Sequence, residues 1–100
     1  MARPPIDGLE IAGDVARVSG VLAPDRIALL LRELEPLLAR GEIGALDVTG
    51  VRHADSAALA LLFACRRRAA AHGHALRISA LPEALTALAQ LYGVDALLAP

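Results

Sequence analysis

The sequence has few aromatic residues and a single cysteine, two kinds of residue that mark common functions, and it contains no lysine. Phe63 and Tyr92 are the only aromatic residues, so the chain lacks the stacking platforms on which single-strand nucleic-acid binders depend. Cys65 is the only cysteine, which excludes an intramolecular disulfide and a cysteine-based zinc site. All ten basic residues are arginine, and eleven acidic residues bring the net charge to −1. This balance does not attract the chain to nucleic acid or acidic lipid.

Long apolar runs are also missing. The longest uncharged one, Ala57–Cys65, is less than half of the ~20 residues that a membrane helix needs. The first residues contain no basic segment followed by an apolar stretch, so no signal peptide is expected. We therefore expect a cytoplasmic protein that does not itself insert into a membrane.

What the chain has in quantity is apolar residues, which make up 56% of its 100 positions. That share suits a well-filled core, and the length suits one domain, which we take as residues 1–100. The spacing of apolar residues predicts an α/β domain with an N-terminal hairpin and parallel β-α-β crossovers in a sheet of about four strands. The expected strands are Leu9–Ala12, Val15–Ser19, Leu46–Thr49 and Leu76–Ser79. The expected helices run from Pro24 to Gly41, from Ser56 to Ala71 and from Pro82 to Gly93, and a loop spans Gly50–Asp55.

The helix expected at Ser56–Ala71 is more apolar than one buried face requires. Leu59, Leu62 and Phe63 already supply an ordinary apolar stripe. Four further apolar residues fall outside it: Ala57, Leu61, Ala64 and Cys65. Either a partner covers this second face, or a neighbouring helix buries Leu61 and the alanines are ordinary surface residues. A further hypothesis is that this face of the helix meets a second copy of the chain in a twofold contact, which would give a weak homodimer.

Ser56 stands where this helix begins. A hydroxyl there can accept a hydrogen bond from a free backbone N–H, which is simple capping and the plainer interpretation. The same free N–H groups and the positive end of the helix dipole also stabilise a phosphate or a partner's carboxylate. Capping and docking are compatible, so both interpretations stay open at this point.

Few other residues stand in a sequence pattern that is typical of a catalytic or metal site. His53 lies close to Ser56, but no Gly-x-Ser-x-Gly turn is present, so we interpret His53 as a loop residue at the edge of a partner contact. His72 and His74 lack a third metal ligand nearby and indicate an exposed turn at a helix end. Asp47 and Asp55 are better explained as local turn formers than as an acid/base or magnesium pair. We expect no enzyme, no metal and no cofactor.

The residues from Leu46 to Leu62, LDVTGVRHADSAALALL, resemble the signature of the STAS domain, a family named for sulfate transporters and anti-sigma-factor antagonists. That signature is a strand ending in an acidic residue, a short loop, Asp-Ser or Asp-Thr, a small residue, usually Gly, and Leu. Here Asp55 and Ser56 match the central pair, and Ala58 stands where Gly is usual. The resemblance implies the STAS fold, with helices packed mainly on one face of a small mixed sheet, and protein binding without catalysis.

Two branches of that family have about this size. In the anti-sigma antagonists, the serine that matches Ser56 is phosphorylated by a partner kinase, although Ala58 would narrow the space above Ser56 and disfavour that step. In the other branch, the small STAS subunit of the Mla-type phospholipid-transport ABC complex docks on the ATPase. The stretches Leu59–Leu62 and Leu85–Val94 resemble this second branch more closely.

The resemblance therefore implies a STAS subunit that binds the ATPase of a lipid-transport ABC complex, at the inner face of the inner membrane. The anti-sigma-factor antagonist, with Ser56 as phosphoacceptor, is the alternative. In either case the expected contact residues surround the start of the helix: His53, Asp55, Ser56, Ala57, Ala58 and Leu61.

Overall fold

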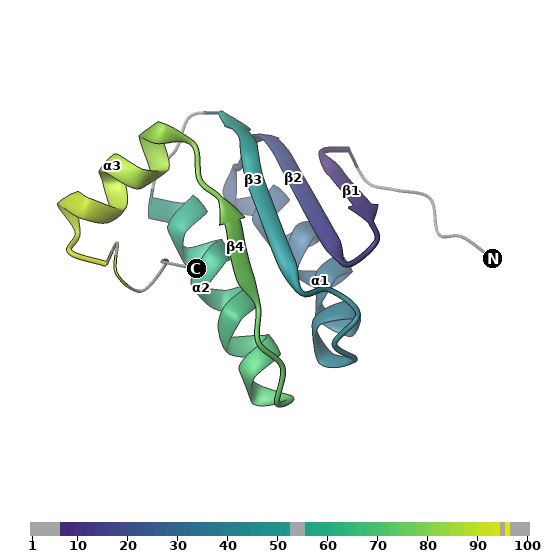
Figure 1. The fold of residues 1–100 in the computed structure, drawn as a ribbon. Helices are drawn as coiled ribbons and strands as arrows, with labels where there is room; N and C mark the ends of the chain where they lie inside the picture. Colours follow the sequence, from purple (N-terminus) through teal and green to yellow (C-terminus); the bar gives the residue numbers. More distant parts are fainter. Residues whose placement is uncertain (1–6, 53–55, 95, 97–100) are drawn as a thin grey trace.

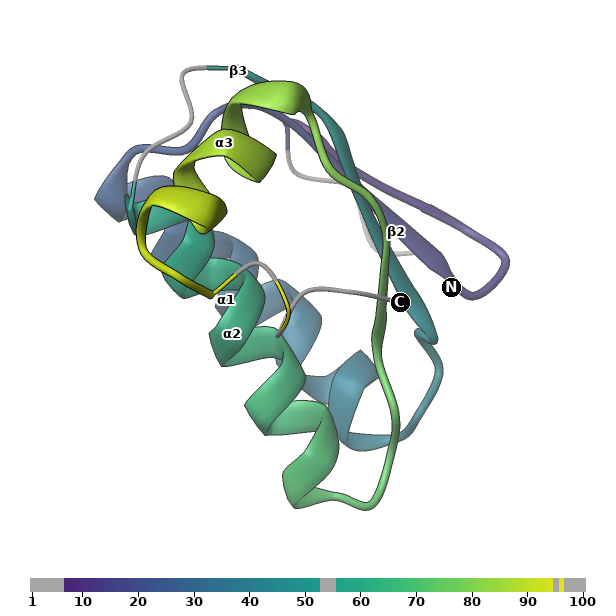
Figure 2. The same cartoon turned by 60° about the vertical axis from the view of Figure 1, so that its left-hand side comes forward.

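The computed structural model describes residues 7–52, 56–94 and 96. The strands are β1 (Leu9–Ala12), β2 (Val15–Val21), β3 (Ala45–Arg52) and β4 (Arg77–Ala80), and the helices are α1 (Pro24–Ala39), α2 (Ser56–Ala71) and α3 (Glu83–Leu91). The strands form one sheet in the order β1-β2-β3-β4, in which β1 is antiparallel to β2 and the others run parallel (Figure 1). All three helices lie on the same side of the sheet (Figure 2). The expected mixed sheet, hairpin and one-sided helices are confirmed.

The hairpin forms at the turn that the sequence marks. Gly13 has φ +61°, in the left-handed region that glycine enters without strain, and Ala12 pairs with Val15 directly across the turn. The helix ends are also where glycines indicated them. Gly41 and Gly93 have φ +70° and follow the last turns of α1 and α3.

β3 is longer than the sequence pattern indicated. We expected a strand at Leu46–Thr49 and a loop directly after it, but β3 continues through Gly50 to Arg52. The pairing register with β2 shifts at this point, and a Cβ at Gly50 would lie 2.8 Å from the Cβ of Ser19. Gly50 therefore marks an irregularity where two strands approach closely, not a strand end. Val51 beyond it is buried.

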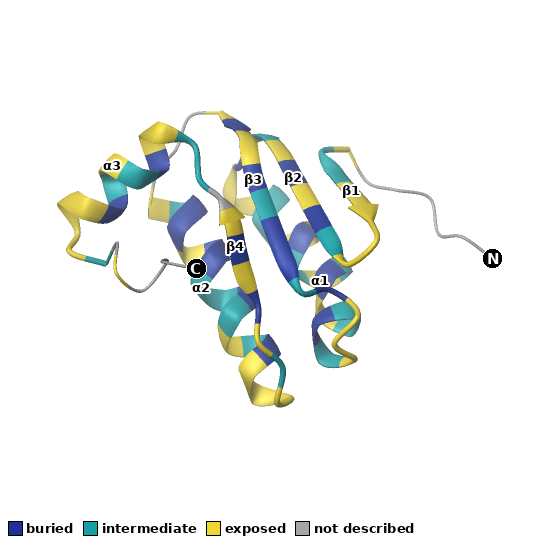
Figure 3. Ribbon diagram, in the orientation of Figure 1, coloured by how far each residue is buried: buried dark blue, intermediate teal, exposed yellow. Residues whose placement is uncertain are grey.

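The core lies between the sheet and the helices. Alternate strand residues such as Val18, Leu46 and Val48 point into it and are buried, and Leu30 and Leu34 meet them from α1 (Figure 3). Within the described ranges, no helix has the length and hydropathy to cross a membrane. From the sequence, Val94–Leu98 is also expected to form a short helix or strand, but residues 95, 97 and 98 lie outside the described residues.

Candidate functional site

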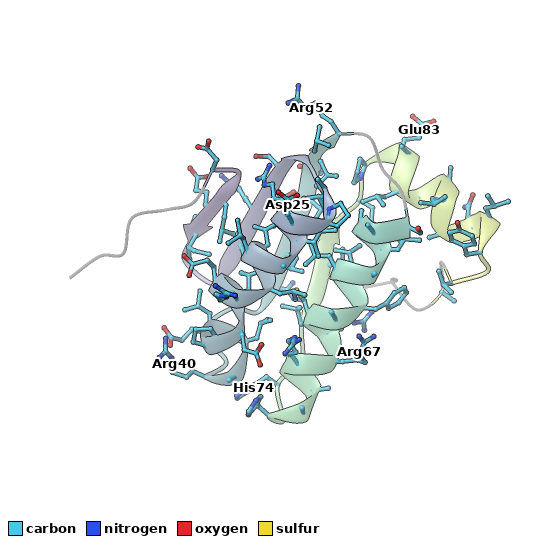
Figure 4. All side chains as sticks on the ribbon, turned by 180° about the vertical axis from the view of Figure 1, so that it is seen from behind. Asp25, Arg40, Arg52, Arg67, His74 and Glu83 are labelled. Atoms are coloured by element: carbon cyan, nitrogen blue, oxygen red, sulfur yellow. The ribbon has the colours of Figure 1, made fainter. Side chains whose placement is uncertain are left out.

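Three helix starts gather at one edge of the sheet. β2, β3 and β4 run parallel and each is followed by a helix, so α1, α2 and α3 all begin at the carboxyl ends of the strands. Figure 4 shows Asp25, Arg52 and Glu83 at this end of the molecule, with Arg40 and His74 at the opposite end. We call it the carboxyl edge, defined by the strand ends Val21 and Arg52 and the helix starts Pro24, Ser56 and Glu83. Binding sites of open α/β sheets commonly form at such an edge.

Ser56 is the first residue of α2 and is exposed. Asp55 and His53 lie outside the described residues, so their expected roles stay predictions. The described part of the site is an exposed hydroxyl on the first turn of a 16-residue helix, where the positive end of the helix dipole favours an anion.

The second apolar face expected on α2 is largely buried. Leu61 and Ala58 are each 1% exposed, and Cys65 is fully buried. α1 packs beside α2 (Figure 4), and the guanidinium of Arg68 in α2 contacts Glu35 of α1. Leu61 lies two helical turns before Arg68 and therefore on the same side of α2, the side that faces α1. The expectation that Leu61 and Ala58 lie open to a partner is therefore corrected. They are core residues, and a neighbouring helix covers this face, as the plainer interpretation had it.

Alanines form the surface that remains beside Ser56. Ala60 is exposed, and Ala57 and Ala64 are half-buried. Such short side chains make a flat surface that another protein can approach closely. The surface is narrower than the sequence indicated, because Leu59, Leu61 and Leu62 are buried in the core, and of the larger side chains in the first half of α2 only Phe63 is half-buried.

The position of Ala58 also changes one argument about Ser56. Residues two apart on a helix point in different directions, and the methyl group of Ala58 is packed in the core. It therefore does not narrow the space above the Ser56 hydroxyl. The substitution of alanine for the usual glycine leaves the hydroxyl accessible, contrary to our expectation.

Two exposed side chains at the carboxyl edge were missed by the sequence pattern. Val21 ends β2 with 44% of its surface exposed, and it pairs in the strand register with Arg52, which is exposed at the end of β3. Arg52 was assigned to the loop Gly50–Asp55, and the strand expected at Val15–Ser19 ended before Val21, because each strand contains a glycine near its end. The available signal was the valine directly after each glycine, Val21 and Val51, because a β-branched residue there continues the strand pattern.

At the opposite end of the molecule, two side chains contact α1, and one of them, His74, was expected to be exposed. His74 is half-buried, and its Nε2 lies 3.1 Å from the carbonyl oxygen of Ala39 at the end of α1. Arg68 donates to the carboxylate of Glu35 at 2.5 Å, joining α2 to α1. The expectation of a wholly exposed histidine turn is therefore wrong for His74. The described residues contain no group of three or more potential metal ligands.

Two further groups are shaped by their surroundings. Burial raises the pKa of the Cys65 thiol to about 12, so Cys65 behaves as a small apolar residue, as expected. The hydroxyl and backbone N–H of Thr49 donate to Asp47, and with Arg17 nearby they hold the pKa of that carboxyl below its usual value. Asp47 thus does local work in β3, as the sequence indicated.

Comparisons with known proteins agree with this architecture. A family model described as Mlab, STAS domain, matches residues 9–99. Among solved structures, the chain is similar to the anti-sigma factor antagonist SpoIIAA in its unphosphorylated form. The TM-score is 0.68 at 15% sequence identity, over 88% of this chain and 81% of that one. A search of curated proteins by sequence finds no match. At this identity the structural likeness establishes the fold alone.

Proposed function

The chain belongs to the Mlab-type STAS domain family, and on that premise we propose that it docks on the ATPase of a phospholipid-transport ABC complex. In this role it is a non-catalytic subunit that stabilises or regulates the ATPase. It works in the cytoplasm, where its partner holds it at the inner face of the inner membrane. The family match over residues 9–99 is the observation that carries the proposal.

The surroundings of Ser56 support the start of α2 as the contact. The hydroxyl is exposed, and the neighbouring Ala57 and Ala60 leave a flat surface. Beneath them, Leu59 and Leu62 anchor the same turns in the core. A partner therefore meets a surface that is already ordered, which lowers the entropy cost of binding.

The surroundings of three potentially reactive groups, Cys65, Asp47 and His74, support a binding role over a catalytic one. Cys65 is buried with a raised pKa, so it is a poor nucleophile. Asp47 is engaged by Thr49, and His74 by a backbone carbonyl. Each of these groups makes a local contact that stabilises the fold.

The experiment is co-expression with the ATPase subunit of such a complex from the same genome, followed by purification through a tag on the ATPase. Ser56→Arg and Ala60→Arg place a long charged side chain on the proposed contact, and we expect each to reduce recovery at least about tenfold. Ala71→Arg is the matched control. Ala71 is also exposed and lies on nearly the same side of α2 as Ala60, but three turns away, about 16 Å along the helix.

The outcomes separate clearly. Loss with Ser56→Arg and Ala60→Arg but full recovery with Ala71→Arg supports docking at the start of α2. Full recovery of all three variants would place the contact elsewhere. No recovery of the unmodified chain would count against the ATPase as partner.

The accessible Ser56 hydroxyl favours one second candidate, an anti-sigma-factor antagonist. In that case a kinase transfers a phosphoryl group to Ser56, and the added negative charge ejects the partner. Intact mass after incubation with ATP and the kinase partner tests it. A phosphate adduct that disappears in Ser56→Ala supports the switch, and an unchanged mass rules it out.

A further inference from the structure

The two edge strands of the sheet are anchored to different degrees. β1 and β4 have four residues each and lie at the two ends of the strand order. β4 contains the buried Ile78, and the hydroxyl of Ser79 donates to the carbonyl oxygen of Leu46 in β3. All four residues of β1 are described and none of them is buried: Leu9 is half-buried, and Ile11 and the other two are exposed. Packing therefore anchors β4 more strongly than β1.

The side chains of β1 do not compensate for this lack of packing. One ion pair joins β1 to β2, between Oε1 of Glu10 and Nη1 of Arg17 at 3.3 Å. Both side chains are more than half exposed, so water screens the pair and it contributes little. The attachment of β1 therefore depends on its backbone pairing with β2 and on contacts at its N-terminal end.

Arg26, in the first turn of α1, makes a contact at that N-terminal end. Its Nη2 donates to the carbonyl oxygen of Ser19 at 2.9 Å, and its Nη1 donates to that of Val21 at 3.4 Å. Both acceptors lie in β2, so they hold the guanidinium against this strand. Nη2 also donates to the carbonyl oxygen of Asp7, two residues before β1, at 2.6 Å. A guanidinium fixed on β2 thus binds the start of β1, and a charged donor makes this hydrogen bond stronger than a neutral one.

Two glycines make room for the guanidinium. Gly8 and Gly20 have φ +79° and +90°, where other residues are strained. A Cβ at Gly8 would overlap Nη2 of Arg26, and a Cβ at Gly20 would lie 2.9 Å from Nη1. The amide of Ser19 also donates to the carbonyl oxygen of Gly8 at 2.9 Å. We call the bonds from Arg26 to Asp7 and from Ser19 to Gly8 the latch.

We propose that β1 opens and closes as a unit while the rest of the domain stays folded, and that Arg26 keeps it closed through the latch. Segments with few buried apolar contacts open locally at a lower free energy than the core. Opening β1 breaks its pairing with β2 and the latch, but it exposes little apolar surface. This inference goes beyond the proposed function and does not depend on the identity of the partner.

The first test uses the unmodified chain and follows amide hydrogen exchange residue by residue by NMR. The amide of Ser19 donates to Gly8 and that of Arg77 donates to Gly44, both at 2.9 Å, so they are matched probes of the two edge strands. Relative to its intrinsic rate, the Ser19 amide should exchange at least about tenfold faster than the Arg77 amide, and low urea should hardly change its rate. Equal protection of the two amides, or a Ser19 rate that rises with urea as global unfolding does, would overturn the proposal.

The second test removes the fork of the guanidinium. Arg26→Lys keeps the charge, so the Ser19 amide should exchange about tenfold faster while the Arg77 amide changes less than about twofold. Arg17→Lys is the matched control, because it makes the same substitution at a screened ion pair and should change both rates less than about twofold. Circular dichroism checks that the variants fold. An unchanged Ser19 rate in Arg26→Lys, or equal acceleration of both amides, would contradict the latch.

Gly8→Ala tests the latch from its other side. The added methyl group overlaps Nη2 of Arg26, so this variant should also accelerate exchange of the Ser19 amide and not that of Arg77. In the Gly8→Ala background, Arg26→Lys should add less than about twofold, because the bond to Asp7 is already lost. Effects that multiply in full would show that Gly8 and Arg26 act independently, and the latch would then be wrong.

Discussion

The first and last turns of α2 face different surroundings. At its start, Ser56 and Ala60 are exposed, and Arg52 before them is exposed as well. Near its end, Arg68 donates to the carboxylate of Glu35 in α1, and the chain that follows folds back so that His74 contacts the backbone carbonyl of Ala39 in α1. Arg68 and His74 near the end of α2 contact α1, while Ser56 and Ala60 at its start are exposed and make a surface that another protein can approach.

The start of α2 is exposed on one side, but it is packed firmly on the other. Ala58, Leu59, Leu61 and Leu62 of the same turns are buried. The side of these turns that faces the core is packed, and the opposite side is exposed to solvent. This combination suits docking, because a rigid exposed surface loses little conformational entropy when it binds. Three predictions test the comparison, in order of decreasing effect, and a fourth concerns Asp47 in β3.

The largest effect is expected at Leu61. Because its side chain is buried, Leu61→Ala should lower the free energy of unfolding by about 2–5 kcal/mol. Ala60→Ser, one residue away but exposed, should change it by less than about 0.5 kcal/mol. Urea unfolding followed by circular dichroism measures both. Similar midpoints for the two variants would mean that the start of α2 is not anchored as described.

His74 should have a moderate effect at the closed end. His74→Ala removes the contact with the carbonyl of Ala39 and should cost about 1 kcal/mol of stability. His72→Ala, on the exposed side of the same turn, should have almost no effect. The same unfolding experiment compares them. Neither variant should change the affinity for the partner when binding is measured in parallel. A loss of affinity with His74→Ala would contradict the interpretation that only the start of α2 contacts the partner.

Local sequence patterns predicted most of the fold, because the spacing of apolar residues and the residues at the ends of each helix or strand are set within that element. The boundaries of α2 at Ser56 and Ala71 agree with the structure, because an N-terminal polar residue and a following glycine mark them. The end of β3 could not be predicted in this way. Gly50 indicates a strand end locally, and only the pairing with β2 shows that the strand continues.

The candidate site was predicted less completely than the fold. Ser56 was found from its motif, but the composition of α2 could not show whether Leu61 faced a partner or α1. That choice depends on how two helices pack, which is a tertiary property. The hydrogen bonds that Arg26, in the first turn of α1, donates to the carbonyl oxygens of Asp7 and Ser19 were beyond prediction for the same reason, because they join segments that precede the helix to the helix itself.

The ion pair between Arg68 and Glu35 should contribute little. Both side chains are more than 40% exposed, so water screens the pair, and we expect a coupling of about 0.5 kcal/mol or less. A double-mutant cycle with Arg68→Ala and Glu35→Ala measures it, and high salt should reduce it further. Arg67→Ala is the control, because Arg67 is exposed on the same helix. A large, salt-independent coupling would show that the closed end is held mainly by this pair.

The smallest effect is the pH dependence of stability that we expect from Asp47, which lies in β3, away from both ends of α2. The Thr49 hydroxyl lies 2.7 Å from Asp47 Oδ1, and the Thr49 N–H, at 3.0 Å, and Arg17 act in the same direction. They hold the pKa of Asp47 below its ordinary value of 3.8. The ionised carboxylate therefore favours folding above that value, and this contribution is lost as the pH falls through the lower pKa of the folded chain.

Asp47→Asn removes this contribution, so it should be less stable than the unmodified chain at neutral pH and nearly equal to it at about pH 2. Thr49→Val should reproduce part of the loss, because it removes the strongest donor to the carboxylate. Urea midpoints at the two pH values measure the difference. A stability difference between Asp47→Asn and the unmodified chain that is the same at both would show that Asp47 stabilises the sheet by packing and not by its charge.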